Sequence, residues 1–282
     1  MTKRRTLETV SLESRNRKMI FKNIWITGAS AGIGKALSEY YAAPGVILGL
    51  VSRGADQLED VALRCHNRGA IVYPYIVDVS DPEKIRACAL EFLEKVKHVD
   101  LVIANAGIRL EEDMEFREWQ IPVQTMSTNF FGVINTFAPF ITSMKERRAG
   151  YLAVISSIAA FRGTPNSGAY SATKAAINIW TESLRLRLKP YGIYVCTLCP
   201  GFVDTEMTGK LTFWMPGLLS TEETAKIIAR GIRRKKRVMI FPWQAKLLWT
   251  FFRILPGPLY DALILWAKAH HPNRKRNSVA EV

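Results

Sequence analysis

From residue 23 onward, short runs of β-branched and other apolar residues alternate with longer amphipathic segments. Seven runs have the length of strands, at 24–27, 46–52, 70–76, 101–104, 152–156, 194–198 and 238–241. Helical periodicity lies between them, at 33–42, 55–68, 82–96, 118–146, 168–189 and 221–235. Strands separated by helices of this length form right-handed crossovers in a parallel sheet. We therefore expect an α/β fold, a doubly wound parallel sheet with helices on both faces.

The composition is that of a folded domain. Of 282 residues, 48% are hydrophobic and 23% are charged, which excludes a disordered chain. Four cysteines are too few for a disulfide scaffold, and no run of 18 apolar residues suggests a spanning helix. The first twenty residues lack the apolar core of a secretory signal. We expect a cytoplasmic protein with a basic extension (1–22), a sheet domain (23–241) and an amphipathic extension (242–282).

The net charge of +14 is concentrated at the two ends of the chain. Residues 1–22 contain seven Lys/Arg and two Glu, and residues 226–276 contain thirteen Lys/Arg and one acid, Asp261. The region between them is nearly neutral. This asymmetry predicts contact with an anionic surface, either lipid or nucleic acid. Solvated basic tails that aid solubility are the other interpretation, above all for the N-terminal end.

A glycine-rich turn follows the first expected strand and opens the first helix, with the sequence Thr27-Gly28-Ala29-Ser30-Ala31-Gly32-Ile33-Gly34. Glycines let the backbone approach a pyrophosphate closely, and the N–H groups at a helix start attract its charge. Tight packing of strand on helix produces the same pattern. The position after the first strand of a βα series nevertheless favours a dinucleotide site.

Three further segments end expected strands, where a ligand crevice forms in such sheets. Arg53 follows the second strand, where NAD-preferring sites carry a carboxylate, and it predicts pairing with the 2′-phosphate of NADP(H) rather than binding of NAD(H). Asp78 and Asn105-Ala106-Gly107 follow the third and fourth strands. A solvated charge, a cap or a turn is the alternative interpretation of these residues.

Tyr170 and Lys174 stand four residues apart in an expected helix and therefore on one face of it. A nearby ammonium and an oxidised nicotinamide would lower the pKa of the phenol, so that it can serve as an acid–base group. Ser157 ends the preceding strand, and its hydroxyl could donate to a substrate carbonyl. Asn129 could bind a water that links the lysine to bulk solvent. Each has a structural explanation by itself, but their joint presence predicts catalysis.

Together these motifs resemble the short-chain dehydrogenase/reductase family over roughly residues 22–240. The matching pieces come in the family's order and are the turn at 27–34, Asp78, Asn105-Ala106-Gly107, Asn129, Ser157, Tyr170-Ser171-Ala172-Thr173-Lys174, and Pro200-Gly201 with Thr205. Ser157 precedes Tyr170 by thirteen residues, a spacing typical of the family. Ala104 departs from the asparagine of many members, and the glycine turn lacks a basic residue, so the NADP(H) prediction depends mainly on Arg53.

The resemblance implies a Rossmann-type catalytic domain and hydride transfer between a nicotinamide and a carbonyl or alcohol. It implies that Tyr170 is the acid–base, Ser157 the carbonyl orienter and Lys174 a ribose ligand and pKa modulator, with Asn129 in a proton relay. Asp78 and Asn105 would lie near the adenine and its ribose, and Val203 and Thr205 near the carboxamide. The cofactor-binding set is then Thr27, Gly28, Ser30, Gly32, Ile33, Gly34, Arg53, Asp78, Val79, Asn105, Ala106, Gly107, Tyr170, Lys174, Pro200, Gly201, Val203 and Thr205. Helices near 118–146 and 168–189 often form dimer or tetramer contacts in this family, which predicts a homo-oligomer.

A pair of cysteines and a pair of histidines are residue types that can bind metals or carry redox chemistry. Their surroundings in the sequence favour neither function. Cys196 and Cys199 lie along an expected buried strand without a second pair, so we expect structural thiols. His270 and His271 lie in a basic tail without neighbouring carboxylates, and we predict no metal site there.

The segment after Thr205 is expected to cover the substrate. Its apolar side chains suit a hydrophobic substrate and are Met207, Leu211, Phe213, Trp214 and Met215. Packing of these side chains on the body or on a second subunit is the alternative.

Residues 242–271 contain two short apolar helical segments broken at Pro256-Gly257-Pro258. The proline break, Arg253 and Asp261 argue against a spanning helix. Trp243, Trp249, Tyr260 and Trp266, flanked by basic clusters at 233–237 and 274–276, suit a helix pair in a membrane interface. A flap over the substrate cleft and a dimer contact are the alternatives, while dense aliphatic surface disfavours nucleic acid.

We therefore predict an NADP(H)-dependent oxidoreductase acting on a lipophilic ketone or secondary alcohol. Peripheral attachment to the inner face of a membrane is compatible with this prediction. The layout resembles bacterial lipid-type ketoreductases, including 3-ketosphinganine-type reductases. A 3-oxoacyl-thioester reductase, with an acyl-carrier or coenzyme A substrate, is one alternative. A non-catalytic nucleotide-binding membrane scaffold is another, although it would not need to retain Asn129, Ser157, Tyr170 and Lys174 together.

Overall fold

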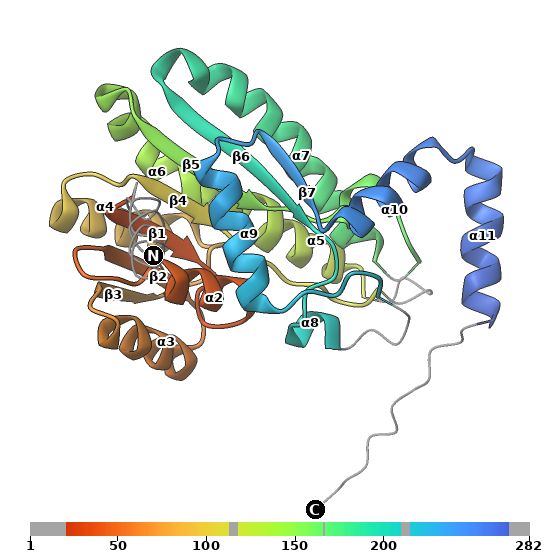
Figure 1. Cartoon of the computed structure of the whole chain (residues 1–282), viewed down its shortest axis with the longest axis horizontal. Coiled ribbons are helices and arrows are strands. Elements are labelled where there is room, and N and C mark those ends of the chain that lie inside the picture. Colours follow the sequence, from red (N-terminus) through yellow and green to blue (C-terminus); the bar gives the residue numbers. More distant parts are fainter. Residues whose placement is uncertain (1–20, 113–117, 166, 210–214, 271–282) are drawn as a thin grey trace, which may run out of the picture.

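The computed structural model describes residues 21–112, 118–165, 167–209 and 215–270. Its centre is a seven-stranded parallel sheet in the order β3-β2-β1-β4-β5-β6-β7 (Figure 1). The strands are β1 (Asn23–Thr27), β2 (Ile47–Ser52), β3 (Ile71–Ile76), β4 (Leu101–Ala104), β5 (Gly150–Ile155), β6 (Ile193–Pro200) and β7 (Val238–Phe241). All seven expected strands are present, and the prediction of a doubly wound, Rossmann-type α/β fold is confirmed.

Helices cover both faces of the sheet, and each face has its own apolar core. On one face pack α2 (Gly32–Tyr41), α3 (Ala55–Asn67) and α9 (Thr221–Arg233). On the other pack α4 (Pro82–Val96), α6 (Gly132–Arg147) and α7 (Gly168–Leu188). Helix α5 (Gln120–Met126) runs into α6 through a π-helical turn, Ser127–Phe131, within the segment expected to be one helix.

The central strands explain why both faces need helices. Every residue of β1 and of β4 is buried. Along β1, Ile24 and Ile26 join one core while Trp25 joins the other, because successive side chains of a strand point to opposite faces. The centre of the Trp25 ring lies 5.3 Å from the centre of the Phe92 ring on α4. Burying one such side chain fully contributes roughly 1.5–3 kcal/mol.

The strand order reverses direction between β1 and β4. From β1 the chain crosses to β2 and β3 on one side, and from β4 to β5, β6 and β7 on the other. Loops after β1 and after β4 therefore leave the sheet in opposite directions, and a crevice opens at the carboxyl ends of these strands.

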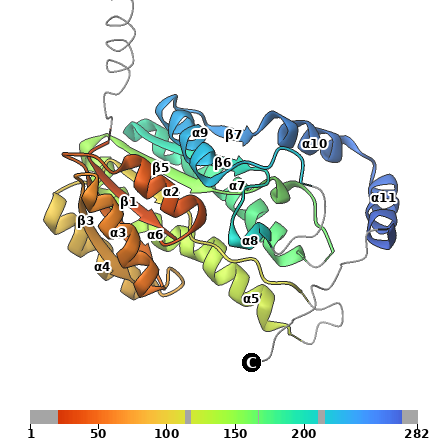
Figure 2. The ribbon, with the colours of Figure 1, turned by 60° about the horizontal axis from the view of Figure 1, so that its bottom comes forward.

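After β7 come two further helices, α10 (Trp243–Ile254) and α11 (Gly257–His270). Figure 2 shows α10 leading away from the end of β7 and α11 standing apart from the sheet and its helices. The chain breaks at Leu255 and Pro256, whereas Gly257 and Pro258 belong to α11, because proline is tolerated in a first helical turn. Among the described residues, no helix has both the length and the apolar character needed to span a membrane.

The basic cluster at 233–237 does not flank these helices as expected. It ends α9 and precedes β7, whereas α10 begins just after β7 ends. The cluster therefore lies at the amino end of β7 and α10 at its carboxyl end, so the length of a strand separates them. The second expected cluster, 274–276, lies outside the described residues.

Candidate active site

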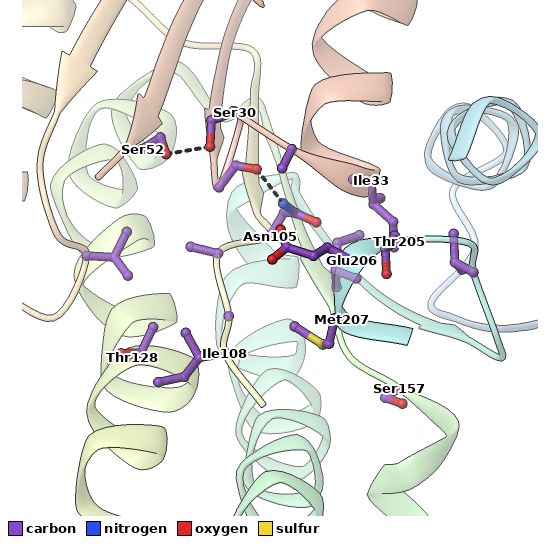
Figure 3. A pocket seen from close by; sticks show the side chains of 18 of the residues that line it. Ser30, Ile33, Ser52, Asn105, Ile108, Thr128, Ser157, Thr205, Glu206 and Met207 are labelled. Atoms are coloured by element: carbon purple, nitrogen blue, oxygen red, sulfur yellow. Dashed lines mark hydrogen bonds between the residues drawn. The ribbon is translucent and has the colours of Figure 1, made fainter. Parts of the chain in front are cut away.

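A cavity of about 430 Å³ lies at the carboxyl ends of the strands. It brings together most of the residues singled out from the sequence, namely Gly28, Ser30, Gly32, Ile33, Arg53, Asp78, Val79, Asn105, Ala106, Gly107, Ser157, Tyr170, Lys174, Pro200, Gly201, Val203, Thr205 and Met207. Figure 3 shows Ser30 of the glycine turn and Ser52 toward one end of the cavity, Asn105 near the middle of the view and Ser157 toward the other end. Thr27, Gly34, Asn129 and Met215 are described but are not in its wall.

The glycine turn has a conformation that side chains would prevent. Gly28 has a φ of +66°, a region that glycine occupies at little cost. A Cβ at Gly34 would collide with the carbonyl oxygen of Gly28. Helix α2 then starts at Gly32, and among the described residues no side chain caps it and none in its first turn is acidic. Its first N–H groups can therefore receive an anionic group in the cavity.

Asn105 braces this turn from the end of β4. Its Nδ2 donates to the carbonyl oxygens of Thr27 and Gly28, both at 3.1 Å, and its backbone N donates to Thr27 Oγ1 at 3.2 Å. Asn105 was expected beside a bound ribose, and it lines the cavity. Both of its side-chain N–H groups donate to the turn, so the side chain joins the ends of β1 and β4, where the strand order reverses.

Arg53 and Asp78 meet at the rim of the cavity. Arg53 Nη1 lies 3.3 Å from Asp78 Oδ2, and the arginine side chain is 57% exposed. Burial raises the pKa of Asp78, but hydrogen bonds from Ser80 and the charge of Arg53 outweigh this and hold it below its ordinary value. The carboxylate is thus ionised, and the guanidinium is held at the end of β2.

Ser157, Tyr170 and Lys174 come from two elements and share the cavity wall. Ser157 lies two residues after the end of β5, and its Oγ accepts from the backbone N of Ala159 at 3.1 Å. Tyr170 lies in the first turn of α7 and Lys174 one turn later. The Lys174 Nζ lies 5.6 Å from the centre of the Tyr170 ring and donates to the carbonyl oxygen of Ile155 at 2.9 Å. The expected shared helix face is therefore present.

Burial has the largest effect on the electrostatics of the tyrosine. It raises the pKa of Tyr170, and this effect outweighs the hydrogen bond with Ser157 and the positive charge of Arg109, which both lower the pKa. Burial also lowers the pKa of Lys174, to about 8. The lysine alone does not acidify the phenol in this structure, because the desolvation that brings the two groups together disfavours both charged forms.

Asn129 is fully buried in the π-helical turn, and its side chain is held by three hydrogen bonds. Its Oδ1 accepts from Ile108 N at 2.8 Å, and its Nδ2 donates to Ile108 O at 2.9 Å and to Thr173 Oγ1 at 3.2 Å. Both N–H groups are thus engaged. The side chain ties the loop after β4 to α7. π-helical turns often occur at functional sites.

Two residues of the loop after β4 hold the start of α7, and the sequence analysis did not identify them. Arg109 donates from Nε and Nη2 to Ser167 Oγ at 3.0 and 2.7 Å. Glu112 Oε1 accepts from the backbone N of Ala169 at 2.7 Å. An acceptor at a helix start satisfies an N–H group that lacks a partner within the helix. Only their proximity to Asn105-Ala106-Gly107 could have suggested either residue.

The segment expected to cover the substrate is described only in part. Helix α8 (Glu206–Gly209) begins it, and Glu206, Met207 and Thr208 all line the cavity. Leu211, Phe213 and Trp214 lie outside the described residues. Met215 is half-buried and does not contribute to the cavity wall.

The two cysteines of β6 are buried, as expected. Burial raises the pKa of the Cys196 thiol to about 12 and that of Cys199 to about 11. Thiols of this kind remain protonated and unreactive at neutral pH.

Comparisons with known proteins agree with this geometry. The family profile described as short chain dehydrogenase matches residues 22–216. A protein of Myxococcus xanthus (strain DK1622) that carries the name uncharacterized oxidoreductase is 34% identical over 249 residues, which cover 87% of this chain and 97% of the relative.

Solved structures share the fold. An alcohol dehydrogenase from Thermococcus sibiricus, in complex with 5-hydroxy-NADP, is 28% identical with a TM-score of 0.70 over 78% of this chain and 95% of its own. A 3-ketoacyl-ACP reductase from Sinorhizobium meliloti 1021 is 27% identical with a TM-score of 0.71 over 80% of this chain and 99% of its own. A short chain dehydrogenase from Mycobacterium paratuberculosis bound to NAD, 20% identical with a TM-score of 0.69 over 78% of this chain and 94% of its own, shows the fold alone.

Proposed function

Because this chain belongs to the short-chain dehydrogenase/reductase family of oxidoreductases, we propose that it interconverts a lipophilic ketone and its secondary alcohol with NADP(H). One observation carries the proposal. Ser157, Tyr170 and Lys174 line the same cavity as the start of α2, where the first N–H groups are available to a phosphate. The side chains suited to carbonyl chemistry and the backbone suited to dinucleotide binding therefore line one cavity.

The residues present fit a dinucleotide. The turn at Gly28 and Gly34 brings backbone close to the cavity, and the positive end of the α2 dipole points to it. Val203 and Thr205 line the cavity as well, and we propose that they contact the carboxamide.

The nicotinamide, when bound, supplies the hydride. The side chains of the protein supply the rest of the chemistry. Ser157 donates a hydrogen bond to the carbonyl oxygen, where negative charge develops during reduction. Tyr170 gives its phenolic proton to the same oxygen. Lys174 binds the ribose, and its charge favours the tyrosinate that remains. Asn129 holds Ile108 and Thr173 in place beside these groups.

The preference for NADP(H) over NAD(H) depends on Arg53. Its guanidinium already faces one carboxylate, Asp78, at the cavity rim. A 2′-phosphate carries more negative charge and offers several acceptors, so it would engage the guanidinium more strongly. The similarity to an alcohol dehydrogenase complexed with an NADP derivative supports this choice.

An apolar substrate fits the part of the cavity near Ser157. Ile108 and Met207 contribute apolar side chains to the wall, and Figure 3 shows Met207 between Ile108 and Ser157 in that view. A second candidate is a 3-oxoacyl thioester, which the similarity to a 3-ketoacyl-ACP reductase favours. An acidic carrier protein would also suit the basic ends of this chain.

Replacing Tyr170 by phenylalanine tests the proposal. We expect Tyr170→Phe to abolish reduction of medium- and long-chain ketones and of an acetoacetyl thioester, with NADPH affinity nearly unchanged. Tyr191→Phe, in the 3₁₀ turn that follows the end of α7 and outside the cavity wall, is the matched control and should keep full activity. Unchanged turnover in Tyr170→Phe would refute the mechanism. A wild-type chain that binds NADPH and reduces no carbonyl would support a nucleotide-binding scaffold instead.

We also propose that α10 and α11 rest on an anionic membrane surface. Trp243, Leu247, Phe251 and Ile254 recur at helical spacing on α10, and Trp243 and Ile254 are 67% and 74% exposed. The helix has Lys246 and Arg253 and no acid, so its own residues, not the cluster at 233–237, supply the positive charge.

Vesicle flotation tests this surface. The full chain should float with vesicles of phosphatidylglycerol and phosphatidylcholine and stay in solution with phosphatidylcholine alone. Trp243→Ser with Leu247→Ser should weaken flotation at unchanged ketone reduction. Equal flotation of the variant would exclude α10 as the contact.

Self-association is proposed through α6 and α7. Ile179 and Leu186 on α7 are 71% and 64% exposed, and a groove beside them is lined by Trp180. Burying this surface in a homodimer would remove it from water. Light scattering should then report twice the monomer mass or a multiple of it, and Ile179→Glu should lower it.

A further inference from the structure

Arg162 joins the catalytic segment to the C-terminal helices. It directly follows the 3₁₀ turn Ile158–Phe161, which itself follows Ser157. Its Nε donates to the carbonyl oxygen of Phe252 at 3.0 Å, and its Nη2 donates to that of Leu255 at 2.5 Å. The two carbonyls belong to the last turn and the C-cap of α10.

Physical chemistry explains why an arginine serves here. The last carbonyls of a helix lack partners within the helix and carry the negative end of its dipole. A guanidinium is always charged and presents several N–H groups in one plane, so it can bind two carbonyls at once. Arg162 therefore caps α10 from a segment 90 residues earlier in the chain.

Two further contacts join the same two regions. Tyr260 of α11 donates its hydroxyl to the carbonyl oxygen of Gly163 at 2.7 Å, and the Arg162 guanidinium lies 4.8 Å from the centre of the Tyr260 ring. The rings of Phe161 and Trp249 meet edge to face at 4.9 Å. Both helices of the extension thus contact residues 161–163.

The other end of this segment is continuous with Ser157. The Ser157 Oγ accepts from Ala159 N, and the Ser157 carbonyl oxygen accepts from Ala160 N at 3.2 Å. A shift of residues 159–163 would therefore change both the side-chain and the backbone hydrogen bonds of Ser157. Arg162 does not itself line the cavity.

We propose that Arg162 is a positioning residue, which docks α10 and α11 onto the segment after β5 and thereby holds Ser157 in its catalytic orientation. The C-terminal extension is then a working part of the reductase, and not only a surface for contact with lipid. This inference rests on the proposed function, because it assigns a consequence to the orientation of Ser157.

Steady-state kinetics of the full chain test the inference. Arg162→Ala should lower kcat for a soluble short-chain ketone by about 10- to 100-fold, because a displacement of about 1 Å has effects of this size. The dissociation constant of NADPH and the KM for NADPH should change less than about twofold, since Arg162 is remote from the glycine turn. Arg162→Lys keeps the charge but not the paired donors, so it should recover part of kcat. Tyr260→Phe, which removes one hydroxyl, should show a smaller loss and also covers the case that Arg162→Ala does not fold.

Arg68→Ala is the matched control. Arg68 also donates to a backbone carbonyl, that of Glu39 at 2.7 Å, but it lies beyond α3 and far from the extension. It should keep kcat within about twofold. A wild-type kcat in Arg162→Ala and Tyr260→Phe would overturn the inference. An equal loss of NADPH affinity would also overturn it, because the effect would then be general destabilisation.

Amide hydrogen exchange separates this inference from the proposed function. In Arg162→Ala, exchange should accelerate in residues 157–163 and 243–255 together, with no change in β1 and α2. This holds whether or not a ketone is reduced. If the wild type proves inactive while the two segments still respond together, the proposed function fails and the docking stands. If 243–255 alone responds, the coupling to Ser157 is refuted.

Discussion

The glycine turn at 27–34 and the extension α10–α11 both lie toward the carboxyl ends of the strands, yet they are held in different ways. The turn is enclosed by backbone: Asn105 binds it at three points, and a side chain at Gly34 would meet the carbonyl of Gly28. The extension is held by a few side chains around Arg162 and Tyr260, while much of α10 faces outward. The glycine turn has no room for an added side chain at Gly34, whereas the extension depends on a few specific contacts and tolerates change elsewhere.

Replacing a glycine by alanine should affect NADPH affinity very differently in the glycine turn and in the extension, and this is the largest difference that we expect. In Gly34→Ala the new methyl group must displace the turn, and we expect NADPH affinity to fall by about 100-fold or more. In Gly257→Ala the Cβ would meet nothing within 4 Å among the described residues, so affinity should not change. Fluorescence titration of NADPH measures both. Wild-type affinity in Gly34→Ala would show that the turn is less constrained than its packing indicates.

A matched pair of leucines should sharpen the comparison in terms of stability. Leu37 on α2 is fully buried, and Leu247 on α10 is 60% exposed. Leu37→Ala should lower the free energy of unfolding by about 2–5 kcal/mol, since it leaves a cavity. Leu247→Ala should change it by less than about 0.5 kcal/mol. Denaturant unfolding provides both numbers, and a large loss in Leu247→Ala would mean that α10 is covered in solution.

Replacing Arg53 tests the rim of the cavity, where this arginine faces Asp78. Arg53→Ala should weaken NADPH binding by about 10- to 100-fold, the loss expected for one charged hydrogen-bonding contact, with NADH binding nearly unchanged. Arg64→Ala is the control, because Arg64 pairs with Asp60 on α3 at 2.9 Å outside the cavity. An unaltered ratio of the two affinities would remove the basis for NADP(H) preference.

The smallest expected effect is a displacement of the pH profile. Arg109 lowers the pKa of Tyr170 through its positive charge, so Arg109→Met should raise that pKa. Alcohol oxidation needs the ionised phenol, and its activity should therefore appear at higher pH than in the wild type. Arg185→Met, at the other end of α7, should leave the profile in place. A profile displaced to lower pH would show that the charge of Arg109 acts elsewhere.

The sequence permitted prediction of the elements that depend on local spacing. All seven strands follow from short apolar, β-branched runs, and the paired position of Tyr170 and Lys174 follows from the helical period of 3.6 residues. The sequence did not identify the protein partners of side chains that can bind several kinds of group. Asn105 braces the glycine turn, and Asn129 binds Ile108 and Thr173. An amide can bind almost any polar group, so its type does not identify its partner.

By itself, then, the chain order of residues determined the doubly wound sheet, the glycine turn after the first strand and the helix face that carries Tyr170 and Lys174. Only the tertiary structure decided that burial raises the pKa of the phenol, that Arg109 and Glu112 hold the start of α7, and that Arg162 fastens the last helices. The physical reason is the distance along the chain. Periodicity acts over a few residues, whereas the hydrogen bonds of Arg162 join groups 90 and 93 positions apart, which meet only after the sheet has formed. Desolvation likewise depends on segments that are distant in the chain.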